Sequence, residues 1–313
     1  MPNKRNRYSL VIIGAGPAGL TASIYASRFS VDNLIIGGAM GGLAFEAHKI
    51  CNFPTEPEIS GMEIIQKMQK HVENYNSPLI VDKVTEIQQE AELFKITTRD
   101  GKVFLADTVL LAIGTQHRKL NLHNEEKFLG KGVSYCATCD AMFYKDKIVA
   151  VVGGSDSAHT ASLYLADIAK KVYQIYREDK FRGEVVWIKR VIKNKKIEVI
   201  YNTKIVGLNG NENLKRIILD KPYKGKKEID VDGLFVEIGT VPEKILAKKL
   251  RLKTNEMGYI KVGDSQSTSQ KGIWAAGDIT DNSDNFRQIL TACSEGAIAA
   301  KNIFEFLKKK EIV

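Results

Sequence analysis

The strongest indication of the fold is Gly14-Ala15-Gly16-Pro17-Ala18-Gly19, which directly follows an apolar run at residues 8–13. A short apolar run of this kind is typical of a central parallel strand, and residues 17–29 continue with apolar side chains at helical spacing. In a G-x-G-x-x-G turn, the first glycine permits the tight turn, the second lets backbone N–H groups reach a pyrophosphate, and the third lets the helix pack on the strand. We therefore expect a dinucleotide at this turn, although no acidic residue follows about 20 positions on to hold its ribose.

The same pattern begins again in the middle of the chain. Residues 147–152 form a second apolar run, Gly153-Gly154-Ser155-Asp156-Ser157-Ala158 a second glycine turn, and residues 158–170 a second helical pattern. Gly153 and Ala158 fit the fingerprint, but Ser155 stands where the backbone should come closest to a pyrophosphate. The turn therefore predicts either a nucleotide site of lower affinity or a βαβ unit that folds in the same way but no longer binds a cofactor. The sequence leaves both interpretations open.

Two such openings in 313 residues predict an α/β protein with two Rossmann-like, three-layer nucleotide-binding domains. The tail of the chain, residues 272–306, has the pattern of a strand, a Gly-Asp turn and a long helix, and we expect it to complete the first domain. The second domain is then an insertion within the first. The expected boundaries are residues 1–117 with 246–313 for the first domain and 118–245 for the second.

The composition narrows the class of protein. Hydrophobic residues make up 44% and charged residues 27%, which excludes collagen-like, mucin-like and largely disordered chains. The net charge is +9, yet no arginine block with interleaved aromatic residues is present, so we expect no nucleic acid and favour an acidic protein partner. No apolar run approaches the ~18 residues that a membrane span needs, and the basic start lacks the pattern of a signal peptide, so we expect a cytoplasmic protein without a membrane anchor.

The cysteines point to redox chemistry. Cys136 and Cys139, in Cys-Ala-Thr-Cys-Asp, have the spacing of an easily exchanged disulfide, and Asp140 beside them can move the proton that thiol–disulfide exchange requires. The rival interpretation is half a zinc site, but Cys51 and Cys293 are isolated and the five histidines form no second ligand pair. We therefore expect a redox dithiol and no metal, with Cys51 and Cys293 packed as small apolar residues.

A further acidic residue, Asp278, follows Gly277 at the end of the apolar run 273–276. A carboxylate at the end of a buried strand needs hydrogen-bond donors. A polyol such as the ribityl chain of a flavin would supply them, and the alternative is an ordinary aspartate in a strand-to-helix turn.

Taken together, these motifs resemble the low-molecular-weight FAD-dependent thioredoxin reductases of the pyridine-nucleotide disulfide oxidoreductase class. The similarity keeps its order over nearly the whole chain: GAGPAG at 14–19, NFP at 52–54, CATCD at 136–140, the second glycine turn, and AAGD at 275–278 followed by Arg287-Gln288. The resemblance implies a homodimer that passes electrons from NADPH or NADH through FAD to the Cys136–Cys139 disulfide and on to thioredoxin. It also implies that the second domain rotates against the first.

The resemblance also implies site residues. The catalytic residues would be Cys136, Cys139 and Asp140, with Cys139 as the sulfur nearest the flavin. In the first domain, Asn52 and Gln288 would lie near the flavin ring and Asp278 on the ribityl chain. The full FAD-binding set would be Gly14, Gly16, Pro17, Ala18, Gly19, Gly41, Gly42, Asn52, Gly277, Asp278, Arg287 and Gln288. The set for NAD(P)H in the second domain would be Gly153, Ser155, Ser157, Ala158, Arg177, Glu178 and Arg182.

The sequence departs from the family pattern at three places, one near the flavin and two at the site for the electron donor. Leu43 follows Gly41-Gly42 where the family usually has glutamine, and Ser155 replaces a fingerprint glycine. The family's His-Arg-Arg signature for the NADPH 2′-phosphate reads Tyr176-Arg177-Glu178 here, although the later Arg182 remains. Losing one charge-assisted hydrogen bond costs about 1.5 to 3 kcal/mol. The donor therefore stays open among NADPH, NADH and a small acidic carrier such as ferredoxin.

Overall fold

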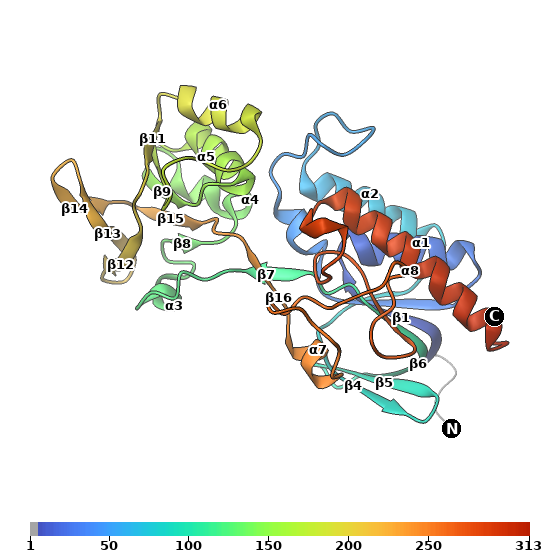
Figure 1. The fold of residues 1–313 in the computed structure, drawn as a ribbon. Helices are drawn as coiled ribbons and strands as arrows, with labels where there is room; N and C mark the ends of the chain where they lie inside the picture. Colours follow the sequence, from blue (N-terminus) through green and yellow to red (C-terminus); the bar gives the residue numbers. More distant parts are fainter. Residues whose placement is uncertain (1–5) are drawn as a thin grey trace. The chain divides into compact units, whose positions relative to one another are not determined.

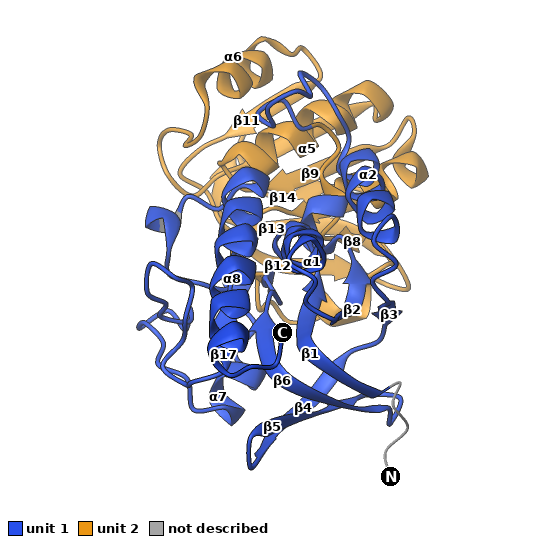
Figure 2. Ribbon diagram, turned by 90° about the vertical axis from the view of Figure 1, so that its right-hand side faces the viewer, with its two compact units in different colours: residues 1–45, 50–116, 241–313 blue, residues 46–49, 117–240 orange. Residues whose placement is uncertain are grey.

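The computed structural model describes residues 6–313, which divide into two compact units. The first unit comprises the described residues up to 45 together with 50–116 and 241–313, and the second comprises 46–49 and 117–240 (Figure 2). Each unit contains a parallel sheet with helices packed on it. The predicted α/β class with two Rossmann-like folds is therefore confirmed.

The first unit is built on a seven-stranded sheet. Its parallel strands run in the order β3 (Leu79–Val81), β2 (Asn33–Met40), β1 (Arg7–Ala15) and β6 (Val103–Leu111), with β17 (Ile273–Ala275) also beside β6. The antiparallel hairpin of β4 (Val84–Glu90) and β5 (Leu93–Thr98) pairs with the start of β6. The middle of β1 is buried on both faces, which explains why its apolar run does not alternate with polar residues.

Three long helices cover one face of this sheet: α1 (Pro17–Arg28), α2 (Gly61–Glu73) and α8 (Ile289–Lys309) (Figure 1). Pro17 is the first residue of α1, where its missing N–H costs no hydrogen bond. A capping box begins α2, because the Glu63 N–H donates to the Ser60 hydroxyl (3.2 Å) and the Ser60 N–H donates to the Glu63 carboxylate (3.0 Å). The short helical elements are η2 (Gly42–Glu46), α7 (Ile245–Lys249) and η4 (Ser283–Asn285).

The second unit repeats the same design. Its parallel sheet has the order β11 (Ile197–Ile200), β10 (Lys171–Ile175), β9 (Ile148–Val152), β15 (Gly233–Val236) and β8 (Val133–Ser134), with α5 (Asp156–Ile168) and α6 (Val185–Lys193) packed against it. The short helices are α3 (Glu125–Phe128), α4 (Ala137–Asp140) and η3 (Ala141–Tyr144). A separate antiparallel sheet consists of β12 (Ile205–Gly210), β13 (Leu214–Tyr223) and β14 (Lys226–Asp230). In both units the strand that leads into the glycine turn, β1 in the first and β9 in the second, lies inside its parallel sheet.

The predicted elements are present, and their ends differ by a few residues. Strand β6 ends at Leu111, and strand β15 ends at Val236. Beyond these ends the chain turns at Gly114 and Gly239, which both have positive φ. Directly after the two glycines, β7 (Thr115–His117) and β16 (Thr240–Pro242) pair with each other and carry the chain from one unit to the other.

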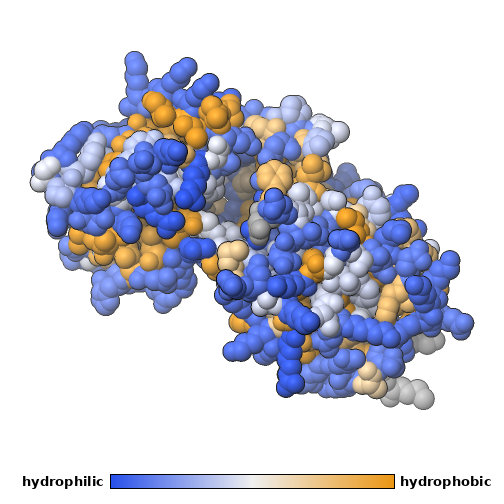
Figure 3. Space-filling model, in the orientation of Figure 1, coloured by the Kyte–Doolittle hydropathy of each residue, from blue (hydrophilic) through white to orange (hydrophobic). Residues whose placement is uncertain are grey.

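The surface of the second unit carries apolar side chains over α6, where Val185, Val186 and Ile192 are exposed (Figure 3). Within residues 6–313, every helix is too short or too polar to cross a bilayer.

Candidate active site

The first glycine turn is closely packed on one side and open on the other. A Cβ on Gly14, which has φ 118°, would overlap the Ala112 carbonyl, and a Cβ on Gly19 would overlap the Gly14 carbonyl oxygen. Gly16 differs, because its φ is −83° and the nearest atom to a Cβ there would be the Gly41 oxygen at 3.7 Å. The protein's own packing therefore requires Gly14 and Gly19, whereas a glycine at position 16 leaves room beside the N-terminus of α1.

Asp278 lies next to this turn. A Cβ on the preceding Gly277 would be 3.0 Å from the Cβ of Ala18, in the first turn of α1. Burial raises the pKa of Asp278 to about 6; the positive charge of Arg287 opposes this shift and the negative charge of Glu295 adds to it. No hydrogen bond to the Asp278 carboxylate is among the causes of this shift. A largely buried carboxylate without donors is costly, so a polar ligand that donates hydrogen bonds fits here.

Glu295 is a residue of this site that the sequence did not reveal. It is buried on α8 and its carboxylate accepts hydrogen bonds from the Gly277 N–H (2.8 Å), the Thr280 hydroxyl (3.0 Å) and the Ser283 hydroxyl (2.6 Å). These bonds fix the turn that carries Asp278. A glutamate in the middle of an amphipathic helix gives no local signal of such a role.

Two further predicted residues are brought together from distant parts of the chain. The Asn52 amide donates to the Gln288 side-chain oxygen (3.0 Å) across 236 positions of sequence. Gly41, whose N–H donates to the Ala15 carbonyl (2.9 Å), places the Gly41-Gly42 pair beside the first glycine turn. Leu43 follows in η2. The open helix N-terminus and the largely buried Asp278 carboxylate together fit the pyrophosphate and the polyol chain of FAD.

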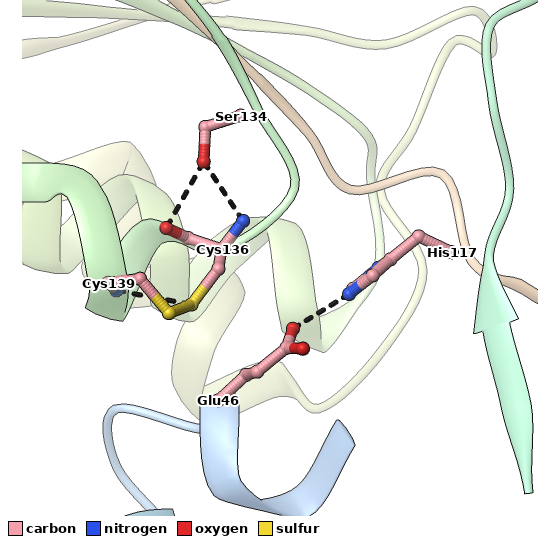
Figure 4. Close-up of polar contacts among 5 residues, drawn as sticks. All are labelled: Glu46, His117, Ser134, Cys136 and Cys139. Atoms are coloured by element: carbon pink, nitrogen blue, oxygen red, sulfur yellow. Dashed lines mark hydrogen bonds and ion pairs between the residues drawn. A yellow bond between two sulfur atoms is a disulfide. The ribbon is translucent and has the colours of Figure 1, made fainter. Parts of the chain in front are cut away.

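The two cysteines of the second unit form a disulfide with their Cα atoms 5.3 Å apart (Figure 4). Cys136 is the N-cap of α4, and its Sγ accepts the Cys139 N–H (3.1 Å). The Ser134 hydroxyl accepts the Cys136 N–H (3.0 Å) and donates to the Cys136 carbonyl (3.2 Å). Cys139 is exposed, and Cys136 and Asp140 are partly exposed. The sulfurs are thus bonded to each other at the surface of this unit, and no cluster of metal-ligating side chains occurs among residues 6–313.

The other two cysteines differ from each other. Cys293 is partly buried, and burial raises the pKa of its thiol. Cys51 is exposed, so the prediction that it packs as a small apolar residue is wrong. The reason is that residues 51 and 52 lie in a loop outside the regular elements, where no sheet or helix covers the side chain.

The second glycine turn keeps the backbone of the first. Gly153 has φ 149°, and a Cβ there would overlap the Glu237 carbonyl, as a Cβ on Gly14 would overlap that of Ala112. Ser155, the N-cap of α5, has φ −115° and ψ −177°, so its Cβ causes no backbone strain. Its side chain forms no capping hydrogen bond, which leaves the hydroxyl available to a ligand.

The charged residues that are predicted to bind the nicotinamide dinucleotide form ion pairs with one another. Arg177 Nε lies 3.1 Å from Glu178 Oε1, and Arg182 Nη2 lies 3.8 Å from the same oxygen. The Arg182 N–H also donates to the Gly154 carbonyl (2.7 Å), which ties this loop to the glycine turn. Glu178 therefore partly neutralises both arginines that the resemblance assigns to a 2′-phosphate.

Three titratable residues of the second unit were not predicted: Glu46, His117 and Glu237. His117 Nε2 lies 2.7 Å from Glu46 Oε2 (Figure 4). Burial, the largest effect, lowers the pKa of His117, but the hydrogen bond and charge of Glu46 and the charge of Glu237 together raise it overall. Burial raises the pKa of Glu237 to about 7. Their positions in the sequence are far apart, so no local motif connects them.

Comparisons with known proteins agree with this geometry. The family model described as pyridine nucleotide-disulphide oxidoreductase matches residues 8–296. The thioredoxin reductase of Treponema pallidum (strain Nichols) is 38% identical over 296 residues, which are 94% of this chain and 95% of the relative. That of Bacillus subtilis (strain 168) is 34% identical over 305 residues, 96% of this chain and 95% of the relative. The crystal structure of Lactococcus lactis thioredoxin reductase in its FR conformation has a TM-score of 0.91 at 32% identity, over 96% of this chain and 99% of the other.

Two Rossmann-like folds and a C-x-x-C disulfide are features of the pyridine-nucleotide disulfide oxidoreductases. The chain belongs to this family and, within it, to the low-molecular-weight FAD-dependent thioredoxin reductases. The predicted family and the predicted enzyme class, thioredoxin-disulfide reductase, are thereby confirmed.

Proposed function

We propose that this enzyme, with FAD as its cofactor, passes two electrons from a nicotinamide dinucleotide to the Cys136–Cys139 disulfide and on to thioredoxin. The observation that carries the proposal is that disulfide, which is partly exposed and lies at the N-terminus of α4. The same chain has space for a ligand beside Gly16 in its first glycine turn. Bound FAD supplies the conversion between hydride chemistry and dithiol chemistry.

The first unit is proposed to hold FAD, within domain boundaries of residues 1–117 and 246–313. Gly14, Gly16 and Gly19, with Pro17 and Ala18, would hold the pyrophosphate, and Asp278 would accept hydrogen bonds from the ribityl hydroxyls. The residues proposed around the rest of the cofactor are Asn52 and Gln288 near the ring, with Gly41, Gly42, Gly277 and Arg287. The open side of Gly16 and the largely buried Asp278 carboxylate support this assignment.

The dithiol would act in two exchange steps. Two electrons and two protons open the disulfide to two thiols, and the Cys139 N–H then favours a thiolate on Cys136. That thiolate attacks the thioredoxin disulfide and forms a mixed disulfide, which the Cys139 thiol resolves as the reduced partner leaves. Asp140 would move the proton. Met142 and Phe143 are 65% and 72% exposed directly after this pair and offer thioredoxin an apolar docking surface.

The donor is proposed to be a nicotinamide dinucleotide at the second glycine turn, within domain boundaries of residues 118–245. Gly153, Ser155, Ser157 and Ala158 would contact its pyrophosphate. Arg177, Glu178 and Arg182 would contact its adenosine ribose. Because Glu178 pairs with both arginines and can accept from ribose hydroxyls, we expect only a small preference for NADPH over NADH. We further propose a homodimer that works in the cytoplasm, where dithiols remain reduced.

The test is an anaerobic titration of the oxidised enzyme. NADPH, NADH and a reduced ferredoxin are added separately, flavin absorbance is followed, and reduction of thioredoxin is measured with each donor. Cys136→Ser and Cys139→Ser should each abolish thioredoxin reduction while the flavin is still reduced, and Cys51→Ser, an exposed cysteine outside the pair, serves as the control.

Three results would contradict the proposal. Activity that survives both cysteine substitutions would indicate another acceptor, such as oxygen or a quinone. A colourless protein that binds no flavin would indicate a non-catalytic binding module. If ferredoxin reduces the flavin and neither nucleotide does, the second glycine turn does not bind the electron donor.

A further inference from the structure

Each glycine turn packs against one residue from a neighbouring part of its unit, and the type of this residue differs between the two units. In the first unit, the Ala112 N–H donates to the Ile13 carbonyl (2.8 Å), and a Cβ on Gly14 would overlap the Ala112 carbonyl. In the second unit, the Glu237 N–H donates to the Val152 carbonyl (2.9 Å), and Gly153 stands in the same relation to the Glu237 carbonyl. The two residues hold equivalent positions, and the methyl group in one unit is replaced by a carboxyl group in the other.

The Glu237 carboxyl group reaches the N-terminus of α5. It accepts a hydrogen bond from the side chain of Ser157, the second residue of that helix. Burial raises its pKa to about 7; His117 and Ser157 oppose this shift, and Glu46 adds to it. The groups that act on the Glu237 carboxyl group are therefore Ser157 on α5, His117 at the end of β7, and Glu46 in the segment 46–49. The N-terminus of a helix that follows a glycine turn is the place where a dinucleotide pyrophosphate binds.

We propose that Glu237 determines nucleotide affinity in this enzyme, because its carboxylate occupies the anion-binding end of α5 and competes with the pyrophosphate of a nicotinamide dinucleotide. The inference rests on the proposed role of the second glycine turn in binding the donor. The first turn has no such competitor, since Ala112 carries no charge. The competition is strongest above neutral pH, where the carboxyl group is ionised, and weaker at pH 6.

The test is isothermal titration of the oxidised holoenzyme with NADP⁺ and with NAD⁺ at pH 6 and pH 8. Glu237→Ala gives the second turn the side chain found at the first, and Glu237→Gln keeps the shape without the charge. Glu212→Gln removes an exposed carboxylate from the β12–β13 turn and is the matched control. Flavin content and melting temperature verify that each variant is folded.

Glu237→Ala and Glu237→Gln should bind the dinucleotides about tenfold more tightly at pH 8, with a smaller gain at pH 6, and Glu212→Gln should stay within about twofold of the parent. Unchanged or weaker binding by both Glu237 variants overturns the inference, and weaker binding would make Glu237 a ligand of the ribose. Absence of binding by every variant also overturns it. Thioredoxin reduction by dithionite-reduced enzyme is measured in parallel, because it tests the dithiol independently of the second turn.

Discussion

His117 Nε2 lies 2.7 Å from Glu46 Oε2, and this contact holds residues 46–49 on the second unit. The neighbouring His48 ring stacks on Tyr164 with centroids 3.6 Å apart. The flanking residues on both sides, 45 and 50, belong to the first unit. The chain therefore passes between the units at both ends of this segment, in addition to passing once in β7 and once in β16.

The His117–Glu46 pair should stabilise the fold only at low pH. Because the pKa of His117 is raised in the folded state, its contribution is fully present below the unfolded value of 6.5 and is lost as the pH rises through the folded value. His117→Gln should cost about 1 kcal/mol at pH 5.5 and close to nothing at pH 8.5. Thermal unfolding at the two pH values measures this, and Glu46→Gln should reproduce it. An equal loss at both values would show that the imidazole acts through packing alone.

Gly16→Ala and Gly19→Ala should separate cofactor binding from folding. A Cβ on Gly16 meets nothing closer than 3.7 Å, so Gly16→Ala should melt like the parent apoprotein and bind FAD at least about tenfold more weakly. A Cβ on Gly19 overlaps the Gly14 carbonyl, so Gly19→Ala should lower the melting temperature of the apoprotein itself. Flavin fluorescence quenching gives the affinity. Tight FAD binding by Gly16→Ala would contradict the assignment of the pyrophosphate to this turn.

Asp278→Asn should have opposite effects on stability and on cofactor binding. A carboxyl group whose pKa is raised from 3.8 to about 6 destabilises the fold increasingly as the pH rises through that interval. Without FAD, Asp278→Asn should therefore be more stable than the parent by about 2 kcal/mol at pH 8 and equal to it at pH 4. Its affinity for FAD should fall, because an amide accepts hydrogen bonds less strongly than a carboxylate. Apoprotein melting and FAD titration measure the two effects; equal apoprotein stability at pH 8 would contradict the account of the buried charge.

Glu178→Gln should increase discrimination in favour of NADPH. Removing the carboxylate frees Arg177 and Arg182 for the 2′-phosphate, so the affinity for NADP⁺ should rise by about tenfold and that for NAD⁺ should stay the same or fall. Glu184→Gln, an exposed neighbour outside this pairing, is the control. A parent enzyme that already prefers NADPH by more than about 100-fold would show that the two arginines suffice despite Glu178.

The two βαβ openings, the family and the dithiol could all be predicted from local sequence patterns. These depend on residues within a few positions of one another: the glycine spacing of Gly14 to Gly19, the apolar runs, and Cys136 with Cys139. Short-range patterns of this kind are visible without a fold, because they reflect the local geometry of a turn or helix.

The side chains that face one another in the sites could be identified only from the folded chain. In the structure Asn52 donates a hydrogen bond to Gln288, and Glu295 accepts one from the turn that carries Asp278. Glu237 lies against the second glycine turn. Residues so distant in sequence meet only after parallel strands have aligned and brought their carboxyl ends to one edge of a sheet. The electrostatics of the site follow from that alignment, since burial and neighbouring charges set the pKa of each group.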